Sequence, residues 1–122
     1  VSCDLEIDFL KLSSYGDEKL SSGSVKLIKD VDAHLGGRDI LIVEDIVDTG
    51  LSVGFIKQLF LPRNPASLKV VSLLYKKRNE HPTSISQTDY IGFEIPDKFV
   101  IGYGLDYAQR LRNLRAIYAL NE

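Results

Sequence analysis

The sequence predicts an α/β fold, mainly a parallel twisted sheet flanked by helices. Two runs of β-favouring apolar residues, Ile40–Val43 and Leu68–Tyr75, are typical of strands that are covered on both faces. Between them, Leu51–Leu61 has apolar residues at helical spacing, and Pro62 is expected to end that helix. A strand, a helix and a second strand in this order indicate a βαβ unit with parallel strands.

Further elements are expected on both sides of this unit. Strands are expected at Leu5–Leu12, Val25–Ile28, Tyr90–Phe93 and Phe99–Gly102. A short helix is expected at Val31–Leu35, just before a Gly-Gly pair. The polar stretch from Ser13 to Ser24 is rich in serine and glycine, which indicates either a mobile lid over a site or a plain hairpin loop. The tail, Arg110–Leu120, has apolar residues at helical spacing.

Length and composition fit a single domain. The chain has 122 residues, of which 44% are hydrophobic, enough for one core. Fifteen Lys and Arg against 17 Asp and Glu give a net charge of −2, so the sequence lacks the basic footprint of a nucleic-acid-binding protein. No apolar run approaches the roughly 18 residues of a membrane-spanning helix. The single Cys3 excludes an internal disulfide and suits a reducing, cytoplasmic compartment.

The residues after the first strand of the βαβ unit form the strongest chemical signal. Glu44 and Asp45 stand side by side, Asp48 follows, and a small turn with hydroxyl groups begins at Thr49. In open α/β sheets, ligands bind at the carboxyl ends of strands. Backbone N–H groups that open a helix bind phosphate, and carboxylates accept hydrogen bonds from ribose hydroxyls. The loop therefore fits a sugar phosphate; the alternative interpretation is that Asp48 or Thr49 simply caps the helix that follows.

Two more side chains are expected at the same edge of the sheet. Lys76 follows the second strand, and its ammonium group only donates hydrogen bonds, so it can select a carbonyl oxygen over an amino group. A solvated basic turn is the alternative interpretation. Phe99 can stack on a planar ring, or it can be an ordinary core residue.

These segments resemble a known family. Ile40–Ser52, with its Glu-Asp-Ile-Val-Asp-Thr-Gly run, closely resembles the phosphoribosyl-diphosphate (PRPP) binding motif of type I phosphoribosyltransferases. Ile91–Tyr107 is similar to the purine-binding segment of the hypoxanthine-guanine branch. The resemblance implies the type I phosphoribosyltransferase fold, with a small hood segment and a flexible loop. It also implies a purine-salvage enzyme that joins hypoxanthine or guanine to PRPP, giving IMP or GMP plus pyrophosphate, with Mg²⁺ as cofactor and a homodimer or homotetramer as assembly.

The resemblance assigns roles to individual residues. Asp48 is the catalytic residue, acting on the proton at N7 of the base. PRPP and its ribose phosphate bind at Glu44, Asp45, Asp48, Thr49, Gly50, Leu51 and Ser52. The purine binds at Lys76, Lys98, Phe99 and Val100. The metal is held by Asp106, Glu44 and Asp45, and pyrophosphate by Arg112. Ser14 and Tyr15 belong to the flexible loop that folds over the active site.

The resemblance covers essentially the whole chain but not the whole family domain. Family members have about sixty further residues upstream, including a strand and the loop that binds pyrophosphate. We therefore expect residues 1–122 to form the C-terminal portion of a single phosphoribosyltransferase domain, without that strand and loop. Two alternatives follow: a non-catalytic regulator that binds PRPP or nucleotides, and an inactive truncated fragment of the enzyme.

Overall fold

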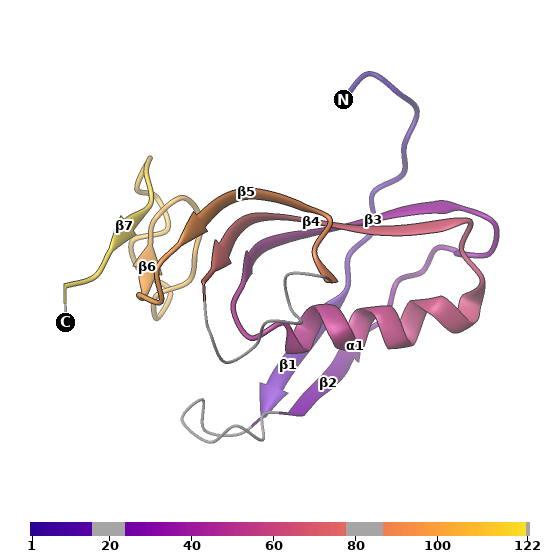
Figure 1. Cartoon of the computed structure of the whole chain (residues 1–122), viewed down its shortest axis with the longest axis horizontal. Coiled ribbons are helices and arrows are strands. Elements are labelled where there is room, and N and C mark those ends of the chain that lie inside the picture. The colour runs from indigo at the N-terminus through magenta and orange to yellow at the C-terminus, as the bar shows by residue number, and fades with distance from the viewer. Residues whose placement is uncertain (16–23, 78–86, 122) are drawn as a thin grey trace.

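The computed structural model describes residues 1–15, 24–77 and 87–121, and in them the predicted α/β fold is present. The central sheet has three parallel strands, with β4 in the middle. Its strands are β3 (Asp39–Val47), β4 (Ser67–Lys76) and β5 (Tyr90–Ile95). Helix α1 (Leu51–Phe60) connects β3 to β4 and lies along one face of the sheet (Figure 1).

Two small antiparallel sheets accompany the central one. Strands β1 (Lys11–Tyr15) and β2 (Ser24–Lys29) form a hairpin on the side of α1 (Figure 1). Strands β6 (Val100–Ile101) and β7 (Tyr118–Ala119) form a second pair beyond the carboxyl end of β5. A 3-10 turn, Leu61–Arg63, follows α1. None of the helices in the described ranges has the length and apolar character needed to cross a membrane.

The hydrophobic core lies between α1 and the central sheet. Val53, Ile56 and Phe60 recur at intervals of three and four residues, so they share one face of α1, and all three are buried. They pack with Ile42 of β3 and Val70 of β4. This packing holds α1 against one face of the sheet. It thereby sets the position of the turn between β3 and α1.

Strand β3 is longer than predicted. It does not stop at Val43 but continues to Val47, which is buried. The apolar pattern resumes after the two acids, and the end of the strand pairs in parallel with Leu74 and Tyr75 of β4. Glu44 therefore lies inside the strand, as does its neighbour, instead of in the loop that follows.

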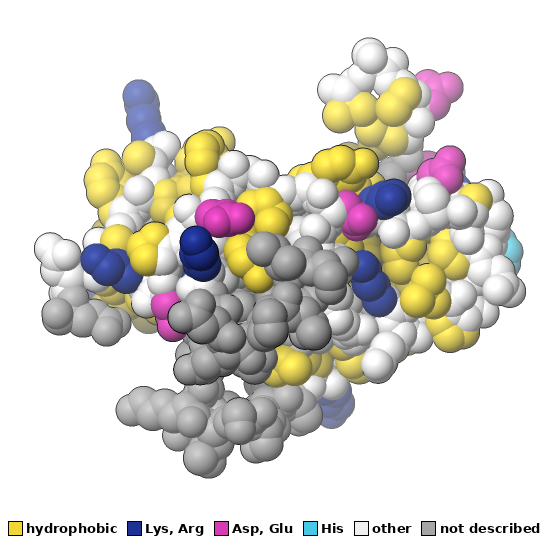
Figure 2. All heavy atoms as spheres, viewed as in Figure 1, with side chains coloured by type: hydrophobic (Ala, Val, Ile, Leu, Met, Phe, Trp, Pro, Cys, Tyr) yellow, Lys and Arg dark blue, Asp and Glu magenta, His cyan; other side chains and the backbone are white. Residues whose placement is uncertain are grey.

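The N-terminal strand was also predicted wrongly, because it begins at Lys11 and not at Leu5. In residues 4–9, acidic and apolar side chains alternate. Glu6 forms an ion pair with Arg38 at 2.9 Å, and Asp8 accepts hydrogen bonds from two backbone N–H groups near residue 32. The intervening apolar side chains are exposed at the surface of this segment (Figure 2). Side-chain contacts thus hold residues 1–10 in place, and no strand of the described residues pairs with the part before β1.

The helix predicted at Val31–Leu35 does not form. At Val31–Leu35 the chain is irregular, because a five-residue helix is too short to be stable, and two of its backbone N–H groups donate to the Asp8 carboxylate. The tail Arg110–Leu120 has apolar residues at helical spacing, but the family resemblance implies a largely extended course, and no helix forms there. It contains turns, bends and β7 instead. Leu111 has a φ of 61°, which is incompatible with a right-handed helix at that point.

The segment after β6 makes a tight turn that depends on glycine. Leu105 donates its N–H to the carbonyl of Gly102 at 3.0 Å, and both Tyr103 and Gly104 have positive φ between them. A Cβ on Gly102 would lie 2.2 Å from the carbonyl oxygen of Ala116. The strand therefore approaches the C-terminal segment too closely for any side chain at this position.

A matched pair of substitutions tests this close approach. Gly102 and Gly104 have nearly equal φ values, 90° and 89°, but a Cβ on Gly104 would meet nothing within 4 Å. Alanine at either position costs about 1–2 kcal/mol for the left-handed backbone. Gly102→Ala should cost a further ~1–3 kcal/mol through the clash. Urea unfolding of both variants measures the difference, and equal losses would contradict the predicted clash.

Candidate active site

The turn after β3 sets the start of α1. Gly50 has a φ of 82° and is the N-cap residue, and its carbonyl accepts the N–H of Gly54 at 3.0 Å. Thr49 Oγ1 accepts the N–H of Leu51 at 3.3 Å. The first turn of α1 contains no acidic residue, so its N-terminal end is electrostatically suited to an anion. Of the two residues considered as helix caps, Thr49 accepts a backbone N–H at the helix start, whereas Asp48 contacts Lys76.

Asp48 lies beside Lys76, the last residue of β4. The Lys76 Nζ is 3.5 Å from Asp48 Oδ2, and the side chains are 10% and 39% exposed. The parallel pairing of Val47 with Tyr75 brings the two residues together, because each follows one member of that pair. A lysine this buried is stable only with a compensating charge nearby, and Asp48 supplies it.

Phe99 lies next to the same lysine. The Lys76 Nζ is 6.0 Å from the centroid of the Phe99 ring, within the range of a cation–π contact. Phe99 is 43% exposed, so of the two interpretations of this residue, the core position is wrong. Its ring also contacts Tyr107, with centroids 5.7 Å apart and planes inclined at 60°. An acid, a cation and two aromatic rings therefore form a continuous series of contacts.

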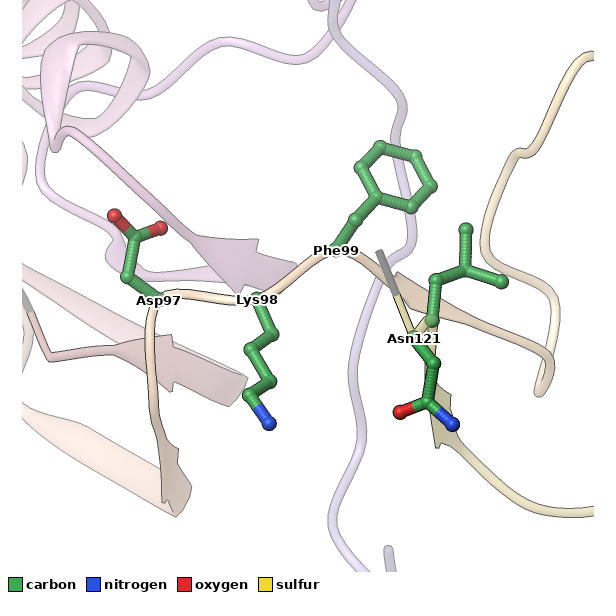
Figure 3. A pocket seen from close by; sticks show the side chains of 5 residues that line it. Asp97, Lys98, Phe99 and Asn121 are labelled. Atoms are coloured by element: carbon green, nitrogen blue, oxygen red, sulfur yellow. The ribbon is translucent and has the colours of Figure 1, made fainter.

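The remaining predicted purine-binding residues surround Phe99 in sequence. Figure 3 shows that Lys98 and Phe99 point to opposite sides of the extended segment before β6, as neighbours in an extended chain do. Lys98 borders a cavity of about 360 Å³ whose other lining residues are Asp97, Phe99, Leu120 and Asn121. Val100 pairs with Ala119 in the β6–β7 sheet. The structure thus places Lys98 away from the exposed ring of Phe99.

Asp106 and Arg112 form an ion pair. Arg112 Nη2 lies 3.0 Å from Asp106 Oδ1, and the backbone N–H of Gln109 donates to the same oxygen at 2.8 Å. The Gln109 hydrogen bond, followed by Arg112, lowers the pKa of Asp106. The predicted metal ligand and the predicted pyrophosphate ligand are therefore adjacent, and Asp106 is held as a carboxylate.

The two acids inside β3 have different surroundings. Adjacent residues of a strand point to opposite faces, and Glu44 is half-buried while Asp45 is exposed. Burial, with a contribution from the nearby Asp45 charge, raises the pKa of Glu44 to about 7. Asp45 accepts the N–H of Ile46 at 2.7 Å. The Glu44 side chain therefore changes its charge near neutral pH.

The donor set fits a metal that arrives with a phosphorylated ligand. In the described part of the chain, no group of three or more His, Cys, Asp or Glu residues gathers into a metal site. Mg²⁺ commonly binds through one or two carboxylates, completed by phosphate oxygens and water. Asp106 offers a carboxylate of this kind, as do Glu44 and Asp45 within the site.

The predicted flexible loop is described only at its start. Ser14 and Tyr15 are the last residues of β1, where they pair with Val25 and Ser24 of β2. The rest of the loop, residues 16–23, lies outside the described residues.

Tyr107, which contacts Phe99, had no role among the residues predicted from the sequence. It was the last residue of the aromatic and glycine-rich segment and received no role there. The only available signal was a second aromatic residue close in sequence to Phe99. Its contact with Phe99 depends on the turns between them, which residue spacing does not define.

The fold and the site together define a class of protein. A parallel sheet with a helix start suited to an anion and with acids near the carboxyl end of a strand is typical of α/β proteins that bind nucleotides or sugar phosphates. Residues 2–108 match the model of the phosphoribosyl transferase domain family, and the chain belongs to that family.

Individual proteins of this family are similar to the chain in sequence and in structure. The hypoxanthine-guanine phosphoribosyltransferase of Bacillus subtilis (strain 168) is 51% identical over 116 residues, which are 95% of this chain and 63% of that protein. A crystal structure of the hypoxanthine-guanine phosphoribosyltransferase of Bacillus anthracis superposes with a TM-score of 0.87 at 40% identity, covering 99% of this chain and 70% of that one. A Trypanosoma cruzi hypoxanthine phosphoribosyltransferase variant complexed with IMP gives 0.79 at 43% identity, covering 95% and 57%. The predicted type I fold and family are thereby confirmed, and the chain spans less than two thirds of the B. subtilis protein.

The raised pKa of Glu44 predicts a pH-dependent stability. Between its usual value of 4.5 and about 7, the folded chain binds more protons at Glu44 than the unfolded chain does. The free energy of unfolding therefore decreases as the pH rises through this range. Glu44→Gln removes that decrease, so the variant should gain about 1–3 kcal/mol relative to the natural chain between pH 5 and 8.

Urea unfolding at both pH values measures this gain. Glu94→Gln, the same change at an exposed position of β5, is the control. A difference between Glu44→Gln and the natural chain that stays constant with pH would show that Glu44 titrates normally.

Proposed function

We propose that this chain forms most of the catalytic domain of a purine-salvage phosphoribosyltransferase. The reaction joins hypoxanthine or guanine to PRPP and yields IMP or GMP with pyrophosphate. The proposal rests mainly on the meeting of Asp48, Lys76 and Phe99, which come from three separate segments. Proteins named hypoxanthine-guanine phosphoribosyltransferase that are 45–51% identical to this chain support it.

The phosphoribosyl group is proposed to bind at the start of α1. Backbone N–H groups from Thr49 to Ser52 would hold the 5′-phosphate, helped by the helix dipole and by the close backbone approach that Gly50 permits. Glu44 and Asp45 would accept hydrogen bonds from the ribose hydroxyls. An ionised Glu44 accepts more strongly than a protonated one, so its raised pKa makes this contact sensitive to pH near 7.

The base is proposed to bind against the exposed ring of Phe99. Lys76 would donate to O6 of a 6-oxopurine, and an ammonium group facing the 6-amino group of adenine would leave two donors opposed. Asp48 would act on the proton at N7 as the bond to the ribose forms. Because Lys76 and Asp48 are ion-paired in the free chain, binding of the base changes the partners of both.

The leaving group is proposed to lie near the Asp106–Arg112 pair. Arg112 would bind pyrophosphate, and Asp106 would hold Mg²⁺ together with the diphosphate oxygens. When bound, the metal screens the diphosphate charge and makes pyrophosphate a better leaving group. The low pKa of Asp106 keeps its carboxylate ionised for this role. We also propose a cytoplasmic location, which a single cysteine suits, and a homodimer or homotetramer.

The decisive test is an assay of the purified chain with PRPP, hypoxanthine and Mg²⁺. Its intact mass should be 13.7 kDa, and IMP is measured by chromatography. Magnesium-dependent IMP formation is the expected result. Binding of IMP without turnover would favour a nucleotide-binding regulator, and absence of both would show that this chain alone is an inactive fragment.

Asp48→Asn tests the assigned proton transfer. The amide keeps an oxygen for Lys76 but cannot take up a proton, so turnover should fall by at least about 100-fold. IMP affinity should change by less than about threefold, since the shape of the pocket is kept. Asp39→Asn, at the other end of β3, is the control for the same chemical change. Equal losses of turnover and affinity would show that Asp48 only binds the ligand.

A further inference from the structure

The ring of Phe99 has few constraints of its own. It lies on the short extended segment between β5 and β6 and is 43% exposed. Its backbone carbonyl accepts the N–H of Leu120 at 2.9 Å, which fixes the main chain but leaves the side-chain torsions undetermined. An exposed ring that is to stack on a ligand loses rotational freedom on binding unless neighbouring groups already hold it.

Tyr107 is the aromatic neighbour that can hold this ring. The centroid distance of 5.7 Å and the 60° inclination are close to the edge-to-face arrangement that aromatic pairs prefer. Lys76 contacts the Phe99 ring at 6.0 Å, so the ring has a cation and an aromatic side chain as neighbours. Tyr107 is itself 38% exposed, so its contact with Phe99 is not simply that of a core residue.

The backbone of Tyr107 is well fixed. Its carbonyl accepts the N–H of Arg110 at 2.8 Å and closes a tight turn. Inside that turn, Gln109 donates to the Asp106 carboxylate at 2.8 Å, and Arg112 binds the same oxygen from the other end. This turn therefore fixes the backbone position from which the Tyr107 ring reaches Phe99, and the contact between the two rings limits the freedom of both.

We propose that Tyr107 is a positioning residue for purine recognition, whose ring holds the Phe99 ring in the orientation that stacks on the base. The proposal rests on the proposed function, because it takes the purine as the ligand of Phe99. Tyr107 acts through Phe99 and does not itself touch the ligand. Since Tyr107 directly follows Asp106, the same turn orients the support of the base and the carboxylate on the pyrophosphate side.

A double-mutant cycle tests this inference. The affinity of the full chain for IMP is measured by titration calorimetry, alongside ribose 5-phosphate, which lacks the base. Phe99→Ala should weaken IMP binding by about 5–100-fold through lost stacking. Tyr107→Ala should weaken it by about 3–10-fold, and Tyr107→Phe, which keeps the ring, by less than about twofold. The double variant should bind IMP no more weakly than Phe99→Ala alone, because Tyr107 has no effect without Phe99.

The controls separate a positioning role from a structural one. Ribose 5-phosphate affinity should be unchanged in all variants, because the effect is confined to the base. Tyr103→Ala removes a more exposed tyrosine from the neighbouring turn and should leave IMP binding unchanged. Circular dichroism and urea unfolding check the fold. If Tyr107→Ala is unfolded, Tyr107→Leu replaces it, and it should show the same loss of IMP affinity.

The outcomes distinguish failure of the inference from failure of the proposed function. If the natural chain does not bind IMP, the proposed function itself is wrong for this chain. If Phe99→Ala weakens IMP binding but Tyr107→Ala does not, only the inference is overturned. Additive losses in the double variant, or equal losses for IMP and ribose 5-phosphate, would overturn it as well.

Discussion

The parallel pairing of β3 with β4 is the constraint on which the rest of the structure depends. It places Val47 beside Tyr75, so the residue after each of them emerges at the same edge of the sheet. Asp48 and Lys76 then meet without any special loop, and their ion pair stabilises a lysine that is almost completely buried. Packing of α1 against the sheet supports this pairing, because the helix connects the two strands and covers their shared face.

The Asp48–Lys76 ion pair also determines the charges near the Phe99 ring before a ligand binds. The Lys76 side chain is stabilised by the Asp48 carboxylate, 3.5 Å away, and by the Phe99 ring, whose centroid lies 6.0 Å from Nζ. A ligand with a carbonyl oxygen can replace part of this stabilisation, whereas a ligand with an amino group adds a competing donor. Under the proposed function, the selectivity for a carbonyl oxygen over an amino group would follow from the contacts that Lys76 already makes.

The elements that depend on local pattern were predictable from the sequence. The βαβ unit, the acids near the end of β3 and the position of Lys76 at the same edge of the sheet follow from apolar periodicity and from the rule that parallel strands share their carboxyl edge. The extent of β3 was underestimated, because acids such as Glu44 ordinarily end a buried strand. The strand expected at Leu5–Leu12 formed only from Lys11, because a strand needs a neighbour and pattern alone cannot supply one.

Elements that depend on unusual backbone conformations were not predictable. Ala108 and Gln109 have φ values of 49° and 63°, each of which costs on the order of 1–2 kcal/mol for a residue with a Cβ. Helical spacing in the tail suggested a helix because a pattern of apolar residues says nothing about such turns. The hydrogen bonds around Asp106 offset this cost, and together they determine where Tyr107 lies. This irregular segment is thus held by specific hydrogen bonds and an ion pair.

The sheet face opposite α1 affects how this chain behaves in solution at high concentration. Val43 is 75% exposed there, and Leu41 beside it is also exposed, as are the apolar side chains of the N-terminal segment. A net charge of only −2 gives little repulsion between molecules at neutral pH, and the isoelectric point, where the net charge is zero, is about 5.7. Colloidal stability of the isolated chain is therefore expected to be poorest in mildly acidic buffer, near the isoelectric point, and to improve as the pH rises above 7, where the net negative charge of the chain is larger.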